Sequence, residues 1–153
     1  MKNISKEKVV IFGIRLVLGF IFLWAFFDKL LGLGFATTSD KAWIAGSSPT
    51  YGFLKLATYG PLANFYQSIA GNIFVDVTFM LGLLLIGLAL ILGIWIKPAG
   101  YGGSLLMLMM WSARLPPEQN PVLDEHIVYA LVLILLTLIK ADEFSIKRFW
   151  RKK

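Results

Sequence analysis

The feature that most constrains this chain is a run of apolar residues, 73–96, that contains a single charged side chain, Asp76. A transmembrane helix needs about 20 consecutive, predominantly apolar residues, and this run meets that length. The composition agrees, because 58% of the 153 residues are hydrophobic and only 16% are charged. A soluble domain of this size has too little interior to bury that excess. The sequence therefore predicts an integral membrane protein.

Three further apolar segments predict three more membrane spans. They cover about 9–31, 99–115 and 121–140, and a proline and several glycines at 98–103 predict a tight turn before the third span. An even number of spans places both chain termini on the same side of the membrane. The expected fold is an all-α integral membrane protein, a four-transmembrane-helix bundle whose single membrane domain covers 1–153.

The charges near the ends of the chain predict its orientation. Most of the 15 Lys and Arg residues lie at the two termini or in the turn at Lys97. Such residues stay on the cytoplasmic side of a bilayer, so we expect a multi-pass protein of a prokaryotic cell membrane with both termini cytoplasmic. A secretory signal peptide also begins with lysines before an apolar run. Arg15 interrupts the run, however, and no cleavage pattern follows Leu31, so we expect an uncleaved first span.

Charge and composition also exclude several classes of function. The net charge of +6 comes from basic residues beside apolar runs, where they contact anionic lipid headgroups. No groove-reading module is visible, so the expected partner is the lipid bilayer and not nucleic acid. The absence of cysteine and the presence of one histidine exclude disulfides, thiolate chemistry, iron–sulfur clusters and a His-rich metal site. We therefore expect no metal.

The connection between the first two expected spans, 32–72, is long and rich in aromatic residues. Pro49 and the Gly60-Pro61 pair mark turns within it. We expect a partly helical extracytoplasmic loop that lies on the membrane surface and is anchored by its aromatic side chains. Two interpretations remain open, an ordered cap that shields the helix ends and a lid over a site.

Each of the four expected spans carries ionisable side chains near its outer end, so these side chains should lie at a similar depth in the membrane, close to its outer face. Asp124, Glu125 and His126 stand at the start of the fourth span, and we take them as candidate catalytic residues. Histidine titrates near neutrality without perturbation, and acidic groups at that depth are costly unless they are paired or face a wet cavity. The candidate substrate-binding residues are the other ionisable groups that lie within a span or close to its outer end: Arg15, Asp28, Lys29, Asp76 and Arg114.

Each of these residues also has an ordinary explanation. Arg15 can extend its side chain to the headgroups instead of pairing with a buried carboxylate or an anionic ligand. Asp28 and Lys29 can be interfacial charges at a helix end. Asp76 and Asp124 can each cap the start of a helix. Periodicity does not decide among these alternatives, because it does not say which helix faces point inward.

Small residues gather on one face of the second expected span. Gly82, Ala89 and Gly93 are separated by seven and four residues, which places them on one side of a helix. Small side chains of this kind let a neighbouring helix approach closely. This face is therefore expected to pack against another helix, of this chain or of a partner.

The chain resembles the DoxX/DoxD family of small four-helix membrane proteins over nearly its whole length, and the fourth-span motif is similar to the DoxD branch. The resemblance rests on three stretches: Arg15 to Gly19 with Phe26 to Leu30, Gly82 to Leu90, and Asn120 to Ile127. It implies a link to redox biology, because DoxD-like proteins are associated with a membrane thiosulfate:quinone oxidoreductase that works with a smaller DoxA subunit. The resemblance does not assign catalytic residues.

Three functions follow as hypotheses. The first is a subunit of a quinone-linked oxidoreductase of the thiosulfate:quinone type, in which a quinone is a substrate and a DoxA-like subunit or another redox partner assists, since the chain has no evident electron carrier. The second is a non-catalytic membrane module that docks or stabilises a redox partner. The third is a binding site for a lipophilic small molecule. Assembly into a homo-oligomer stays open.

Overall fold

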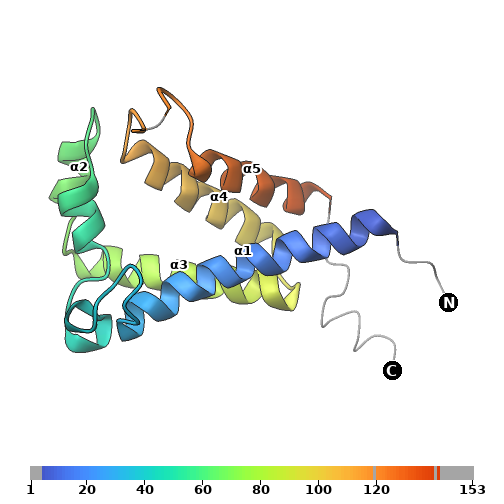
Figure 1. The fold of residues 1–153 in the computed structure, drawn as a ribbon, viewed down its shortest axis with the longest axis horizontal. Helices are drawn as coiled ribbons and strands as arrows, with labels where there is room; N and C mark the ends of the chain where they lie inside the picture. Colours follow the sequence, from blue (N-terminus) through green and yellow to red (C-terminus); the bar gives the residue numbers. More distant parts are fainter. Residues whose placement is uncertain (1–4, 119, 140, 142–153) are drawn as a thin grey trace.

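The computed structural model describes residues 5–118, 120–139 and 141, and within these ranges the fold is all-α with no β-sheet (Figure 1). Four longer helices follow the order of the expected spans. Their bounds are α1 Lys6–Leu31, α3 Ile73–Leu92, α4 Ile96–Ser112 and α5 Glu125–Leu138. The all-α prediction is confirmed. The basic residues Lys2, Lys140 and those at 147–153, on which much of the orientation prediction depends, lie outside the described residues.

Local chemistry explains where the helices begin and end. The side chain of Asn72 accepts a hydrogen bond from the backbone N–H of Phe74 and caps the start of α3. Asp124 caps α5 in the same way through the N–H of His126. Gly32 and Gly93, which end α1 and α3, have φ of 67° and 69°, a left-handed conformation that favours glycine. The cap prediction is thus confirmed for Asp124, whereas Asp76 is not the cap of its helix.

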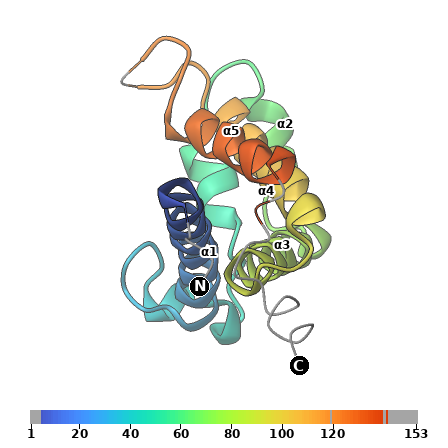
Figure 2. The ribbon, with the colours of Figure 1, turned by 90° about the vertical axis from the view of Figure 1, so that its right-hand side faces the viewer.

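The four longer helices form two pairs, α1 with α3 and α4 with α5 (Figure 2). Glycines permit both close approaches. A Cβ at Gly19 of α1 would lie 3.1 Å from the carbonyl oxygen of Gly87 of α3, and a Cβ at Gly87 would lie 2.6 Å from Leu23. In the other pair, a Cβ at Gly100 of α4 would overlap the hydroxyl of Thr137 in α5. The helix backbones therefore meet at these glycines.

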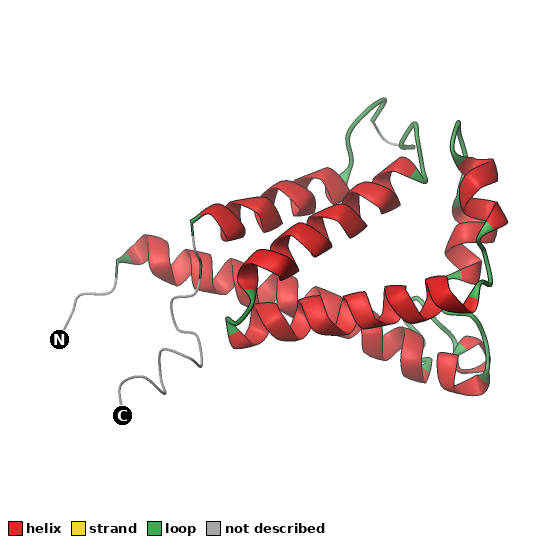
Figure 3. Ribbon diagram, turned by 180° about the vertical axis from the view of Figure 1, so that it is seen from behind, coloured by secondary structure: helices red, strands yellow, loops and turns green. Residues whose placement is uncertain are grey.

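The two pairs diverge from each other along the bundle. α3 and α4 are joined by the short turn at 93–95, and from that turn they separate toward the end where α2, Ala63–Ser68, stands (Figures 1 and 3). We call this end of the molecule the α2 end. The start of α1 and the end of α5 lie at the opposite end (Figure 1), as an even number of helices requires. The second and third segments therefore form a hairpin, but a splayed one. Its predicted turn at 98–103 is wrong, because these residues lie within α4 and the turn is at 93–95.

The connection 32–72 is partly helical, as predicted. It contains the 3₁₀ turns η1, Ser39–Lys41, and η2, Trp43–Ala45, followed by the π-helical turn η3, Gly52–Ala57, and by α2. Two buried carboxylates hold it to the bundle. Asp28 accepts hydrogen bonds from the N–H groups of residues 35 and 36, and Asp76 accepts them from hydroxyls of residues 48 and 50. The connection is therefore an ordered part of the fold.

Two helices in the described part of the chain, α1 and α3, are long and apolar enough to cross a membrane by length and composition. Their 26 and 20 residues correspond to about 39 and 30 Å. Most of each helix is not buried by the rest of the chain, and exposed side chains such as Val17, Phe20 and Leu85 are apolar. The two helices suggest membrane association.

The other two helices are shorter than the expected spans. α4 has 17 residues and α5 has 14, which correspond to about 26 and 21 Å. The span predicted at 121–140 begins four residues before the helix does, so its predicted start at Pro121 is wrong. The helix begins at Glu125, because Asp124 adopts an extended conformation and caps it. A four-span bundle stays a prediction.

Candidate functional site

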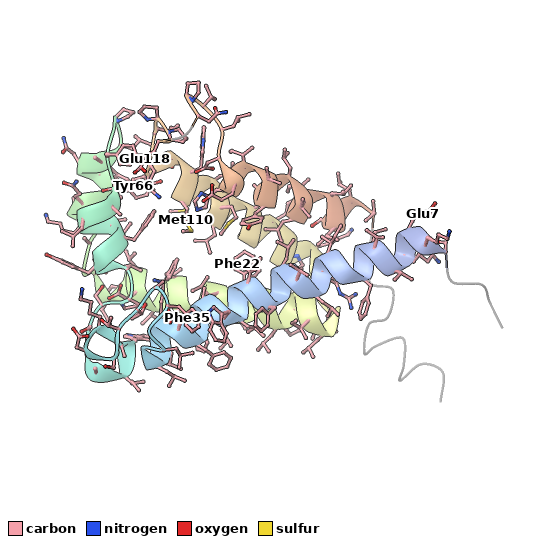
Figure 4. All side chains as sticks on the ribbon, in the orientation of Figure 1. Glu7, Phe22, Phe35, Tyr66, Met110 and Glu118 are labelled. Atoms are coloured by element: carbon pink, nitrogen blue, oxygen red, sulfur yellow. The ribbon has the colours of Figure 1, made fainter. Side chains whose placement is uncertain are left out.

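A cavity of about 770 Å³ lies in the space between the diverging helices α3 and α4, and α2 and η3 close it at the α2 end. Its walls along α3 extend from Phe74 to Ala89, and those along α4 from Pro98 to Met110. Tyr66 of α2 and Met110 of α4 both line it and come from facing elements (Figure 4). Several wall residues are also exposed, so the cavity is an open groove. We call it the α3–α4 groove.

The walls of the groove are almost entirely apolar, and the polar side chains among its lining residues are few. The four polar side chains all lie near the α2 end: Lys29 in the last turn of α1, Thr50 just before η3, Tyr66 in α2 and Thr78 in the second turn of α3. Toward the turn at 93–95 the lining residues are all apolar, and Trp95 is the last of them. The groove thus has a polar end and a long apolar end.

Two of these four polar groups are already paired inside the protein. Thr50 donates a hydrogen bond to Asp76, and the hydroxyl of Tyr66 lies 2.6 Å from the hydroxyl of Ser112. Lys29, by contrast, has no hydrogen bond or ion pair with any described residue. Its neighbour Asp28 is buried and directs its carboxylate to two backbone N–H groups of the loop that follows α1, at 3.2 and 3.0 Å.

The three candidate catalytic residues form a separate cluster at the first turn of α5. His126 Nδ1 lies 2.9 Å from Asp124 Oδ2, and the same carboxylate caps the helix through the N–H of His126 at 3.0 Å. An ionised carboxylate only accepts, so Nδ1 donates this hydrogen bond. Glu125 is exposed beside them. None of the three lines the α3–α4 groove.

This cluster is also the one group of metal-ligand side chains found among the described residues. One ligand atom from each of Asp124, Glu125 and His126 lies within 4.8 Å of the others. The three residues are consecutive at a helix start, and capping accounts for the position of Asp124 without an ion. The expectation of no metal stays a prediction.

Arg114 lies where the end of α4 meets the connecting segment. Its guanidinium forms an exposed ion pair with Glu118 at 2.8 Å and lies 5.7 Å from the ring centroid of Tyr59. The backbone N–H of Tyr59 donates to the carbonyl of Ala113, which holds the two segments together. Arg114 does not line the groove, so its contacts are those of a junction between segments.

Arg15 lies far from the other candidates, near the start of α1. It is fully buried, its Nη1 donates to the carbonyl oxygen of Ala141 at 2.9 Å, and its guanidinium lies 5.1 Å from the ring centroid of Phe12. The interpretation in which Arg15 extends to the headgroups is therefore wrong. Its visible role is to join α1 to the chain just after α5.

The expected single pocket with a charged mouth is thus only partly present. The predicted ionisable residues do reach the same end of the bundle, except Arg15, but the splayed helix pairs separate them. Of the eight predicted site residues, Lys29 alone lines the groove. Sequence reasoning missed Thr50, Tyr66 and Thr78. Tyr66 stood out only as one of several aromatic residues, and nothing in the sequence indicated that the connecting segment would fold against α3.

The small-residue face of α3 also has a different role from the expected one. Gly82 and Ala89 line the groove, and a Cβ at Gly82 would meet nothing within 4 Å. The close approach of α1 occurs at Gly87 instead. Gly82 therefore leaves space in the α3–α4 groove, and no other helix in the described part of this chain packs against it.

In comparisons with known proteins, no family, no characterised protein and no solved structure matched the chain. The resemblance to the DoxX/DoxD family therefore depends on the three sequence motifs alone.

Proposed function

We propose that this chain is a multi-pass membrane protein that binds a quinone in the α3–α4 groove, as a subunit of a quinone-linked oxidoreductase. The observation that carries the proposal is the groove itself, about 770 Å³ in volume, apolar along its length and polar at one end. Pockets for small lipophilic ligands have volumes of roughly 300–1,000 Å³ and apolar walls with a few polar groups. A quinone has the matching form, a ring with two oxygen acceptors and an apolar tail.

The membrane setting is supported by the length and exposure of the apolar helices. α1 and α3 reach about 39 and 30 Å, and their exposed faces are apolar. The shorter helices α4 and α5 would complete four spans in a locally thinned bilayer. In this arrangement the α2 end is the extracytoplasmic one, and the groove opens between α3 and α4 to the hydrocarbon, from which a quinone would enter.

The polar cluster of Asp124, Glu125 and His126, expected to be catalytic, does not transfer protons to the quinone in this proposal. Direct proton transfer to a quinone requires the donor within hydrogen-bond reach of the ring oxygen. None of the three residues lines the groove, so we do not assign them that step. Reduction of a quinone takes two electrons and two protons. This chain has no evident electron carrier, so we propose that a redox partner supplies the electrons, a DoxA-like subunit if the resemblance extends to the reaction.

The proposal is tested by filling the groove without disturbing the packing. Gly82 lines the groove and has open space where a side chain would be, so Gly82→Leu should fold and occupy part of the cavity. Gly13 of α1 also has nothing within 4 Å and does not line the groove, which makes Gly13→Leu the matched control. Both variants would be purified gently from native membranes, and their bound quinone and partner proteins measured by mass spectrometry.

We expect close to one quinone per chain in the wild type and in Gly13→Leu, and little or none in Gly82→Leu. Equal quinone content in all three proteins would exclude the groove as the site. A wild type without quinone but with a tightly bound partner protein would favour the second hypothesis, a membrane module that docks a redox partner.

A further inference from the structure

We infer that Lys29 is the residue that selects the ligand of the groove, by donating a hydrogen bond from its ammonium group to an oxygen on the ligand's head. The inference rests on the proposed function, because it assumes a ligand in the α3–α4 groove. The inference adds that the polar head of the ligand lies at the α2 end of the groove and that this head must carry a hydrogen-bond acceptor. The apolar tail then lies along α3 toward Trp95.

The first argument is the balance of donors and acceptors around the groove. A lysine ammonium carries three donors and no acceptor, and an ammonium without partners at an apolar wall is costly. Lys29 is half-buried and has no hydrogen bond or ion pair with a described residue. An acceptor on a bound molecule would remove that cost.

The second argument is that the two nearby carboxylates accept hydrogen bonds from groups other than Lys29. Asp28 uses one oxygen for the N–H of Phe35 and the other for the N–H of Ala36. Asp76 accepts from the hydroxyls of Ser48 and Thr50. Neither carboxylate forms an ion pair with Lys29. Lys29 interacts electrostatically with Asp28 but forms no hydrogen bond or ion-pair contact with it, so the ammonium donors remain available to a ligand with an accepting or anionic oxygen.

The third argument is the distribution of polar groups along the groove. The wall of α3 from Val75 to Ala89 covers 14 steps of the helix, about 21 Å, and Thr78 is its one hydroxyl. Lys29 and Thr78 are both at the α2 end, and neither side chain forms a hydrogen bond with a described residue. A molecule with its oxygen at Lys29 therefore has only apolar wall beyond the first turns of α3.

The experiment compares two probes that share a tail and differ in the head. One is a benzoquinone with a ten-carbon alkyl chain, and the other is benzene with the same chain. Their affinities would be measured on purified full-length protein in nanodiscs of phosphatidylcholine, a lipid with no net charge to compete for Lys29. The variants are Lys29→Met, which removes the charge at similar length, and Lys29→Arg, which keeps it. Lys55→Met is the control, because Lys55 is an exposed lysine that does not line the groove.

We expect Lys29→Met to weaken quinone binding by about tenfold or more, the usual effect of losing a hydrogen bond to a charged group. Binding of the alkylbenzene should not change. Lys29→Arg should restore most of the quinone affinity, and Lys55→Met should bind both probes as the wild type does. Quinone affinity unchanged in Lys29→Met, or an equal loss for both probes, would overturn the inference.

The same assay separates this inference from the proposed function. If Gly82→Leu loses the quinone while Lys29→Met keeps it, the groove binds a quinone and only the role of Lys29 is wrong. If the wild type binds neither probe, the proposed function fails and the inference fails with it. A ten-carbon fatty acid that binds more tightly than the quinone, and only when Lys29 is present, would support the role of Lys29 and overturn the quinone assignment.

Discussion

The first turn of α5 and the α3–α4 groove are opposite kinds of polar site. At α5, Asp124 accepts both from the backbone and from His126, so the charged group and its donors satisfy one another. In the groove, Lys29 lies beside apolar walls and forms no hydrogen bond or ion pair with a described residue. The comparison teaches that the density of ionisable residues in a sequence is a poor guide to a ligand site. A dense cluster can be complete in itself, whereas a single donor beside an empty apolar space requires a partner.

The comparison is tested most strongly by two glycines of α4 that face opposite ways. Gly100→Leu should destabilise the protein by about 3 kcal/mol or more, because its Cβ would overlap Thr137 and lie 2.8 Å from the carbonyl oxygen of Leu133. Gly102→Leu should leave stability unchanged, because a Cβ there meets nothing within 4 Å, yet it should reduce quinone content because Gly102 lines the groove. Unfolding in detergent measures the first effect and mass spectrometry the second. Equal stabilities for the two variants would contradict the packing described for α4 and α5.

A second prediction concerns the carboxylate that holds the connecting segment beside the groove. Asp76→Ala should cost about 2 kcal/mol, because the hydroxyls of Ser48 and Thr50 lose a charged acceptor. Quinone binding should weaken as well, since Thr50 lines the groove. Asp76→Asn keeps an acceptor oxygen and should lose less. Thermal unfolding with and without added quinone measures both quantities, and an Asp76→Ala protein as stable as Asp76→Asn would argue against this role.

The α5 cluster should respond more weakly, and only in stability. Asp124→Ala removes the helix cap and should cost about 1 kcal/mol, whereas Asp124→Ser retains a capping oxygen and should cost little. Neither variant, nor His126→Ala, should change the quinone content, because none of these residues lines the groove. Loss of bound quinone in His126→Ala would show that the α5 cluster, and not only the groove, takes part in ligand binding. It would support the catalytic role first expected for the cluster.

The smallest effect is expected at the surface ion pair of Arg114. Glu118→Gln should change the free energy of unfolding by less than about 0.5 kcal/mol, because Glu118 is exposed and Arg114 only half-buried, and a pair open to solvent gains little. The melting temperature of the variant at low and at high salt measures this contribution. A large loss that high salt does not alter would show that Arg114 holds the connecting segment more firmly than its exposure suggests.

The sequence predicted the elements well where a single local rule decides them. The apolar runs located all four longer helices. Capping was the ordinary explanation given for Asp124 beside the catalytic one, because a carboxylate just before a helix can accept from its first N–H groups. The sequence failed to predict the start of the fourth span, expected at Pro121, because the start of α5 is set by its cap at Asp124. It also misjudged Asp76, because the donors to that carboxylate come from Ser48 and Thr50, in a segment whose path no periodicity predicts.

The sequence by itself determined the class of the molecule, an all-α chain with helices of membrane-spanning length, because apolar content and run length are properties of the chain alone. Only the tertiary structure decided which polar residue faces a cavity. That choice depends on two glycine contacts, Gly19 with Gly87 and Gly100 with Thr137, which pair the helices and leave α3 and α4 apart. The spacing between helices is set by contacts between residues far apart in the sequence, so no local pattern encodes the space that remains beside Lys29.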